Sequence, residues 1–255
     1  MAQISTGEAR GSAELAPWPR RPARLAHAVV EALTDRVVAG FFPPGSVLPS
    51  EPELCETFGV SRTTIREAVK ALEAKGLVHA RQGSGTTVAA QEEWNLLDPV
   101  VLAATFQHDD ELVVLDQLVG IRSALESQMA AQAAAVADEA DLRAIQEVLD
   151  RMDEETRTPQ LFIETDVAFH AAVMQASGNR LGQSIVRIVH TQARTTSLYN
   201  GTPDERACAT ANAEHRRIVE RLAARDAEGA ARAMAAHIEQ AWQRRRFPAS
   251  RSSAG

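Results

Sequence analysis

The stretch from residue 50 to residue 90 restricts the possible folds of this chain more than any other part. SEPELCETFG begins with Ser50 and Glu53, which have the spacing of a helix capping box, and a glycine ends this short helix. SRTTIREAVKALEAKG begins a second helix with Ser61 as N-cap and ends it at Gly76. LVHARQGSGTTVAA follows with two β-prone runs around a Gln-Gly-Ser-Gly turn. Two capped helices followed directly by a hairpin predict a winged helix-turn-helix.

The second of these helices carries a polar stripe that suits DNA. Its apolar side chains share one face, which leaves Arg62, Thr63, Arg66 and Lys70 on the opposite face. Arginine can donate two hydrogen bonds to guanine, and threonine can contact phosphate or a thymine methyl group. Any surface helix can carry Arg and Lys, but the capped helix before this one and the hairpin after it favour a DNA-recognition helix.

The net charge of -7 would by itself argue against a nucleic-acid partner. The charge is unevenly spread, however. Residues 1–90 hold ten Lys and Arg against nine Asp and Glu, whereas residues 91–255 hold seventeen against twenty-five. A near-neutral front half attached to an acidic rear half is compatible with a DNA-binding module joined to a second domain.

PPGSVLPSEPELCETFGVSRTTIREAVKALEAKGLV resembles the DNA-binding domain of the GntR family of bacterial transcription regulators, over about residues 25–90. The resemblance implies DNA contacts from Arg62, Thr63, Thr64, Arg66 and Gly83. The family often has arginine after the Ser-Glu or Ala-Glu of the second helix, where this chain has Pro52, so one contact is expected to be missing or supplied elsewhere. Because one winged helix covers only a half-site, a homodimer on a palindromic operator of double-stranded DNA is expected.

The rear half reads as helical nearly throughout. Turn signals such as Pro159 separate segments of helical periodicity, and no fixed-period repeat indicates a solenoid. The expected helices span 98–107, 110–137, 138–156, 159–177, 180–199, 204–225 and 226–246. The predicted fold class is therefore mainly α, with an N-terminal winged helix-turn-helix and its small β-hairpin, and a C-terminal antiparallel bundle that is all-helical.

The expected organisation has two domains. It consists of a flexible tail (1–22), a DNA-binding domain (23–91), a linker with its helix (92–107), a helical domain for effector and metal (108–247) and a second flexible tail (248–255). The chain contains no run of eighteen apolar residues, and its N-terminus lacks the apolar region of a secretory signal. A cytoplasmic protein without a membrane segment is expected.

DVAFHAAVMQASGN, residues 166–179, places an aspartate and a histidine on an apolar helix face. Their spacing of four puts Asp166 and His170 one above the other. An unpaired carboxylate in a core is costly, so it needs a partner or a metal. His215 and His237 also lie on apolar helix faces. Taken singly, each histidine is more often a hydrogen-bonded core residue, but three nitrogens and one oxygen together suit a divalent transition metal.

This pattern, with its ASGN helix stop, is similar to the C-terminal ligand-binding domain, called FCD, of the FadR subfamily of GntR regulators. The resemblance now covers about residues 25–246. It implies that Asp166, His170, His215 and His237 hold a divalent metal ion, zinc foremost, with nickel or manganese as alternatives. No ligand role is assigned to His27, His79, His108 or His190, although the helix of His190 is expected to line the bundle.

Two further stretches bear on the ligand. IRSALESQMAAQAA is similar to the place where the family uses an arginine to meet an effector carboxylate, which assigns Arg122 to that role. The alternative is a surface salt bridge between Arg122 and Glu126. EEWNLLDPVVLAATFQ resembles the linker of subfamily members that answer to sugar acids such as galactonate or hexuronates; Trp94 and Leu97 alternatively fasten the two domains together.

Three functions compete for these residues. The first is a dimeric transcription regulator, a repressor more often than an activator, which releases its operator when a small organic acid enters the metal site. The second is a metal-dependent hydrolase-like enzyme, but no glutamate base of the H-E-x-x-H kind accompanies the ligands and the DNA module would be unexplained. The third is a metal-free sensor of acyl ligands. The sequence favours the regulator over an enzyme.

Overall fold

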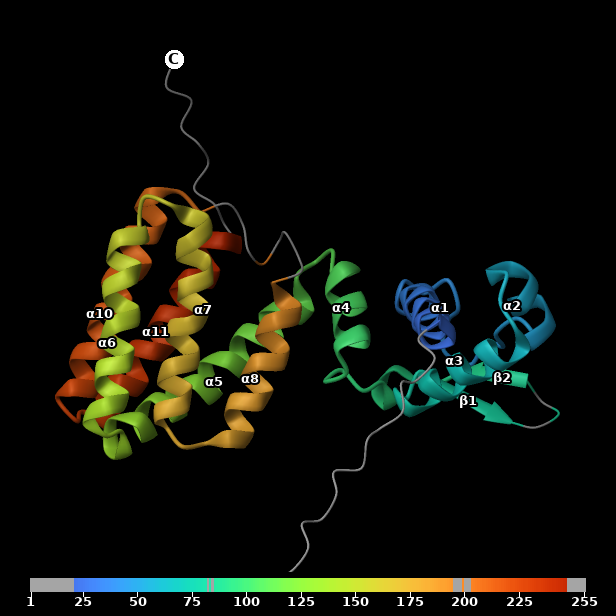
Figure 1. Cartoon of the computed structure of the whole chain (residues 1–255), viewed down its shortest axis with the longest axis horizontal. Coiled ribbons are helices and arrows are strands. Elements are labelled where there is room, and N and C mark those ends of the chain that lie inside the picture. Colours follow the sequence, from blue (N-terminus) through green and yellow to red (C-terminus); the bar gives the residue numbers. More distant parts are fainter. Residues whose placement is uncertain (1–20, 82, 84, 195–198, 200–202, 247–255) are drawn as a thin grey trace, which may run out of the picture.

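The computed structural model describes residues 21–81, 83, 85–194, 199 and 203–246, which form two bodies joined by helix α4 (Figure 1). The N-terminal body comprises α1 (Arg21–Val38), α2 (Glu51–Phe58), α3 (Arg62–Ala74), β1 (Val78–Arg81) and β2 (Gly85–Val88). The link consists of the short η1 (Gln91–Glu93) and α4 (Pro99–Gln107). The C-terminal body comprises α5 (Val113–Val136), α6 (Glu139–Glu155), α7 (Pro159–Ala176), α8 (Arg180–Ala193), α10 (Glu205–Ala223) and α11 (Ala227–Arg246). The predicted fold class is confirmed, whereas the tails expected within 1–20 and 248–255 lie outside the described residues.

The caps read from the sequence begin the helices of the N-terminal body. The backbone N–H of Ser50 donates to Oε2 of Glu53 at 2.7 Å, which forms the reciprocal half of the capping box on α2. Ser61 Oγ accepts from the backbone N–H of Thr64 at 3.2 Å and caps α3. Gly59 ends α2 with a φ of 63°, a conformation that favours glycine. The turn between α2 and α3 is therefore specified locally.

The hairpin forms the wing. Strands β1 and β2 pair antiparallel, with Val78 opposite Val88 and Arg81 opposite Gly85. An isolated bridge adds Val47 to Thr87 at the outer side of β2. Buried apolar residues of the strands and helices form one core; they include Val29, Leu33, Ile65, Leu72, Leu77, Val78 and Val88. The wing is thus fixed against α1 and α3 by a shared core.

Three helix ends differ from the sequence-based bounds by more than the others. Helix α1 begins at Arg21, within the stretch expected as a tail, because a proline in the first turn is compatible with a helix. Helix α5 begins only at Val113, since the Asp109 carboxylate accepts from the backbone N–H of Leu115 at 2.8 Å and caps the helix from outside. Helix α8 ends at Ala193, and residues 195–198 of the expected longer helix lie outside the described residues.

The C-terminal body is a bundle around a second, separate core. Helix α5 packs along α11 and also contacts α7, α8 and α10, while α6 packs on α7 and α10 (Figure 1). The core includes Leu115, Met129, Ile145, Met152, Phe169, Val173, Ile218, Leu222, Met234 and Trp242. Helices α7, α10 and α11 therefore direct their apolar faces toward one interior.

Helix α4 belongs to both cores. Val101 packs with the core of the N-terminal body, whereas Leu102 and Phe106 pack with the core of the bundle. Asp98 caps α4 by accepting from two backbone N–H groups through Oδ1, and its Oδ2 accepts from Nζ of Lys75 at 2.5 Å. Since Lys75 caps the C-terminus of α3, the ion pair ties the end of α3 to the start of the linker helix. No helix among the described residues is long and apolar enough to span a bilayer.

Candidate functional site

Helix α7 supplies the first two side chains of the site. Pro159 begins the helix, and Phe169, Val173 and Met174 turn its apolar face into the bundle core. His170 is buried on this face, and the Asp166 side chain one turn earlier is only 17% exposed. The two lie on the same face of the helix because they are four residues apart.

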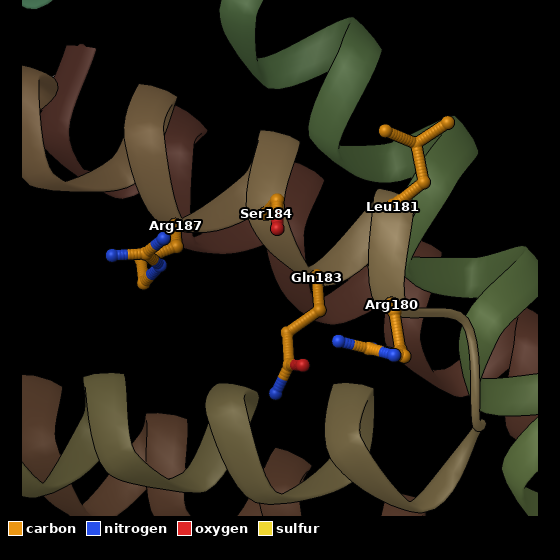
Figure 2. Close-up of a pocket in the computed structure, with 5 residues that line it drawn as sticks. All are labelled: Arg180, Leu181, Gln183, Ser184 and Arg187. Atoms are coloured by element: carbon orange, nitrogen blue, oxygen red, sulfur yellow. The ribbon is translucent and has the colours of Figure 1, made fainter. Parts of the chain in front are cut away.

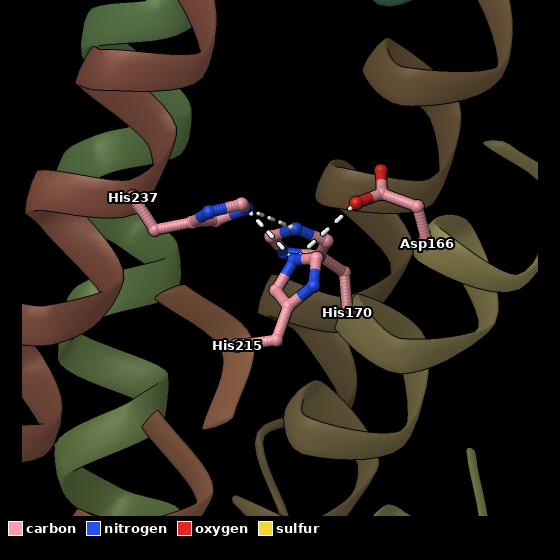
Figure 3. A group of neighbouring side chains, drawn as sticks. All are labelled: Asp166, His170, His215 and His237. Carbon is pink, nitrogen blue, oxygen red and sulfur yellow. Dashed lines mark hydrogen bonds and ion pairs between the residues drawn. The ribbon is translucent and has the colours of Figure 1, made fainter. Parts of the chain in front are cut away.

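His215 of α10 and His237 of α11 meet these side chains in the bundle interior (Figure 3). Nε2 of His237 lies 3.0 Å from Nε2 of His215 and 3.2 Å from Nε2 of His170. Nε2 of His215 lies 3.3 Å from Oδ1 of Asp166. The four ligand atoms all lie within 4.8 Å of one another. The four residues that the sequence singled out thus form one cluster, hereafter the Asp-His cluster.

Two glutamates orient the imidazoles from outside. Oε2 of Glu126 lies 2.6 Å from Nδ1 of His170, and Oε2 of Glu214 lies 2.9 Å from Nδ1 of His237. An ionised carboxylate only accepts hydrogen bonds, so each Nδ1 must carry the proton. In a neutral ring with the proton on Nδ1, Nε2 has the free lone pair, and this is the tautomer that binds a metal through Nε2; the two Nε2 atoms face each other at 3.2 Å.

The cluster fits a divalent cation. Facing lone pairs on Nε2 of His170 and Nε2 of His237, which are 3.2 Å apart, would repel each other unless a proton or a cation lies between them. Nδ1 of His215 is buried without a hydrogen-bond partner among the described residues, so no hydrogen bond at Nδ1 fixes the tautomer of this ring. Three imidazole nitrogens and one carboxylate oxygen are a donor set suited to zinc, nickel or manganese.

The electrostatics of the cluster also favour a cation. Burial lowers the pKa of His237 to about 3, and the neighbouring His215 acts in the same direction. Burial alone would raise the pKa of Asp166, but the hydrogen bond with His215 and the nearby imidazoles hold it well below its usual range. At neutral pH the imidazole of His237 is therefore neutral and the carboxylate is charged, as metal ligands must be.

Arg122 lies next to the cluster but is not on the surface. Its side chain is 6% exposed, and its Nε donates to Oε1 of Glu126 at 2.6 Å. Nη1 donates to the hydroxyl of Tyr199, the single tyrosine of the chain. The Arg122–Glu126 pair that the sequence offered as a surface salt bridge does form, but it is buried and continues through Glu126 to His170. The effector role of Arg122 stays a prediction.

Several neighbours of the cluster were not assigned a role from the sequence. Glu214 precedes His215 in the chain yet contacts His237, and Arg244 donates to both of its carboxylate oxygens at 2.7 and 2.9 Å. The buried ring of His190 lies edge-on to those of His170 and Tyr199. For His190, the sequence signal that could have indicated a place near the cluster was its position on the apolar face of its helix. No local sequence pattern indicates a role for Glu214 or Arg244, because Glu214 is on α10 and its partners are on α11.

A shallow depression on α8 is separate from the cluster (Figure 2). It is lined by Arg180, Leu181, Gln183, Ser184 and Arg187. Arg180, Leu181 and Arg187 are exposed, so this is an open part of the outer surface rather than an enclosed site.

The predicted DNA contacts divide into two groups. Arg62, Thr63 and Arg66 are exposed on α3, and Gly83 lies at the hairpin turn with a φ of 83°. Thr64 is buried, and its hydroxyl lies 2.9 Å from that of Ser61. Its side chain is therefore part of the N-cap of α3 and does not share the exposed face of the other three.

Arg66 and Pro52 lie at the boundary between α2 and α3. Nε of Arg66 donates to Oε2 of Glu51 at 3.0 Å, across an exposed contact between the two helices. Pro52 occupies the first turn of α2, where a missing N–H costs no helical hydrogen bond. An arginine of α3 thus contacts Glu51, the residue just before Pro52.

Comparisons with known proteins agree with both halves of the structure. The family model described as bacterial regulatory proteins, gntR family, matches residues 25–88, and the model described as FCD domain matches residues 117–240. The chain is 30% identical over 205 residues to the galactonate operon transcriptional repressor of Escherichia coli (strain K12), which covers 80% of this chain and 90% of that protein. It is 33% identical over 204 residues to the HTH-type transcriptional regulator LutR of Bacillus subtilis (strain 168), which covers 78% and 91%.

A solved structure shares the fold. The structure of Lar, which controls the expression of the Listeria monocytogenes agr system, superimposes with a TM-score of 0.57 and is 18% identical in sequence. The match covers 90% of this chain and 98% of that chain. At this level of identity, the match is evidence for the fold alone.

Proposed function

The chain belongs to the GntR family of bacterial regulatory proteins and carries an FCD domain, and from this premise we propose that it is a repressor whose operator binding is controlled by a small carboxylate effector. The family membership makes it a transcription regulator rather than an enzyme. In the proposal, the effector binds at a divalent metal ion held by the Asp-His cluster. The sugar acids and related hydroxy acids are the proposed effector class, and the similarity to a galactonate operon repressor supports it.

The Asp-His cluster is the observation that carries this proposal. Its four ligand atoms lie within 4.8 Å of one another, with two imidazoles oriented by glutamates. When bound, a divalent ion, zinc foremost, would supply coordination positions for the carboxylate and hydroxyl oxygens of an acid. Glu126 and Glu214 hold the ring orientations, and Arg122 is positioned beside His170 through Glu126.

The DNA-contacting surface in the proposal is the exposed face of α3 together with the wing. Arg62, Thr63 and Arg66 would enter the major groove, and the turn at Gly83 would approach the minor groove or the backbone. A homodimer would place two such surfaces on the half-sites of a palindromic operator in the cytoplasm.

The ligand would act by shifting a population of conformations. An acid that binds more tightly to the conformation with low operator affinity favours that conformation. Helix α4 is the described connection between the two cores, and Asp98 ties it to the C-terminus of α3 through Lys75. A displacement of α4 by the bundle would therefore reach the recognition helix through this ion pair.

Metal analysis tests the site assignment. Protein purified without chelator is expected to carry about one equivalent of divalent metal per chain, and the double variant Asp166→Ala, His215→Ala is expected to carry none, because half of the ligands are removed. The double variant Asp153→Ala, His27→Ala removes the same residue types at exposed positions and is expected to keep the metal. Equal metal content in the wild type and in the cluster variant would show that the assignment is wrong.

A gel shift on the protein's own upstream DNA tests the regulatory role. Operator binding is expected to weaken when an aldonic or uronic acid is added to the metal-loaded protein, and to be insensitive to the same acid after chelation. A response that survives chelation would instead support the metal-free sensor of acyl ligands and contradict the metal-dependent proposal.

A further inference from the structure

The buried charges around the Asp-His cluster are arranged in pairs, and their sum restricts the charge of a ligand. The first pair is Arg122 and Glu126, whose side chains are 6% and 0% exposed and whose Nε and Oε1 atoms are 2.6 Å apart. The negative charge of Glu126 thus compensates the guanidinium inside the protein. Arg122 can still donate hydrogen bonds to a carboxylate, but it brings no unpaired positive charge to the site.

The second pair is Glu214 and Arg244. Arg244 donates to both oxygens of Glu214, at 2.7 and 2.9 Å, and the same carboxylate accepts from His237. Glu214 is buried, whereas the Arg244 side chain is 32% exposed. The net charge of this pair is also zero. The pair contacts Nδ1 of His237, just as the Arg122–Glu126 pair contacts Nδ1 of His170.

Unlike Glu126 and Glu214, the Asp166 carboxylate contacts no arginine or lysine in the described interactions. Its ion-pair partner is His215. With a metal on Nε2, His170 and His237 act as neutral ligands, because the single proton of each ring is on Nδ1 and is donated to a glutamate. The protein therefore contributes a single unpaired negative charge at this point. A divalent ion on these ligands leaves a net charge of +1.

Charges farther out do not change this sum strongly. Arg246 pairs with Asp116 at 2.7 Å. Arg245 lies over the ring of Tyr199, 5.3 Å from its centroid, and is half-buried, so solvent partly screens its charge.

We infer that the metal-loaded site selects a monoanionic acid and discriminates against a dicarboxylate of the same size and hydroxyl pattern. The inference rests on the proposed function and specifies the ligand class of the same site. One carboxylate brings the buried charge to zero, and hydroxyl groups supply neutral donors for the remaining coordination and hydrogen bonds. A second carboxylate would be buried without a compensating charge, which is costly in a protein interior.

Matched acids test the inference by isothermal titration with the metal-loaded full-length protein. Galactonate and galactarate differ only in whether the last carbon is an alcohol or a carboxylate, and 2-hydroxybutyrate and malate differ only in a terminal methyl or carboxylate. For each pair of acids that binds, we expect the affinity for the monoanion to exceed the affinity for the dianion by about 100-fold or more. Metal content is measured before and after each titration, because dicarboxylates can extract metal.

Two variants distinguish an electrostatic cause of the monoanion preference from a steric cause. Glu214→Gln keeps an acceptor for His237 but leaves Arg244 unpaired, so the site gains one positive charge and the preference is expected to move toward the dianion by about tenfold or more. The double variant Glu214→Gln, Arg244→Gln restores neutrality and is expected to restore the preference for the monoanion. A merely structural disturbance at Glu214 would not be reversed by the second substitution.

The outcomes are distinguishable. A dianion that binds the metal-loaded wild type as tightly as its matched monoanion would overturn the inference and leave the proposed function standing. Failure of every acid to bind while the metal is retained would overturn the proposed function, and the inference with it. If Glu214→Gln loses its metal, the inference is accepted or rejected from the relative affinities of the wild type for the matched acids.

Discussion

The two domains place their ion pairs in opposite surroundings. In the DNA-binding domain, the side chains of Arg66 and Glu51 are 64% and 40% exposed. In the helical domain, those of Arg122 and Glu126 are 6% and 0% exposed. An exposed pair contributes little to stability and can exchange its partner for a phosphate, whereas a buried pair cannot lose one member without a large cost. The first arrangement suits a surface that must bind and release DNA, and the second suits a site that must keep a fixed geometry.

Removing the acidic partner from each pair gives the largest expected contrast. Glu126→Ala is expected to lower the free energy of unfolding by about 3–5 kcal/mol, because Arg122 is left buried and unpaired and His170 loses its acceptor. Glu51→Ala is the matched control and is expected to cost less than about 1 kcal/mol. Urea unfolding with chelator present measures both without a contribution from metal. Equal losses would contradict the contrast between the two domains.

Acidification is expected to destabilise the helical domain selectively. Burial holds the pKa of His237 at about 3, whereas an imidazole in the unfolded chain has a pKa of about 6.5. Protons therefore bind preferentially to the unfolded chain, so this stability is fully present above about pH 6.5 and is lost as the pH falls toward 3. From pH 7 to pH 5, His237 alone accounts for about 2 kcal/mol. Burial also lowers the pKa of His190 and that of His215, which act in the same direction.

Tryptophan fluorescence can resolve this effect by domain. Trp94 packs against the core of the N-terminal body, and Trp242 lies in the core of the bundle. Variants that lack Trp18 and retain only one of these two tryptophans would report urea unfolding of each part, in chelator, at pH 7 and pH 5. The two described histidines of the DNA-binding domain, His27 and His79, are exposed, so the Trp94 signal is expected to change less. Equal shifts of both signals would argue against the buried imidazoles as the cause.

A substitution on the exposed pair is expected to act on DNA binding alone. Arg66→Ala should weaken operator affinity about tenfold and reduce the slope of log affinity against log salt by about 1, while the metal content stays unchanged. Arg216→Ala removes an exposed arginine paired with Asp153 in the helical domain and should leave operator affinity unchanged. Gel shifts over a range of salt concentrations measure both. Unchanged affinity of the Arg66 variant would remove α3 as the recognition helix.

The sequence was most informative where the physical signal is local. Ser50, Glu53 and Ser61 specify helix starts through side chains that bond to the backbone within three residues, and the structure forms each of these caps. The grouping of Asp166 with three histidines also came from the sequence, through apolar helix faces and the resemblance to the FCD domain. Helix ends that depend on a side chain outside the helix were predicted less accurately. At Val113, for example, the Asp109 carboxylate from outside the helix caps its start.

By itself, the sequence determined which helices form and which faces they bury, because these follow from periodicity along each helix, and the resemblance to the FCD domain grouped the four side chains of the cluster. Only the tertiary structure decided which polar groups are buried and which contacts join different helices. Glu214 contacts His237 rather than a neighbour in sequence, Arg122 is neutralised in the core, and Thr64 is buried in the N-cap of α3. The contact of Glu214 with His237 depends on the distance between two helices, and the burial of Arg122 and Thr64 depends on the elements that pack over them; packing sets both, rather than the order of residues in the chain.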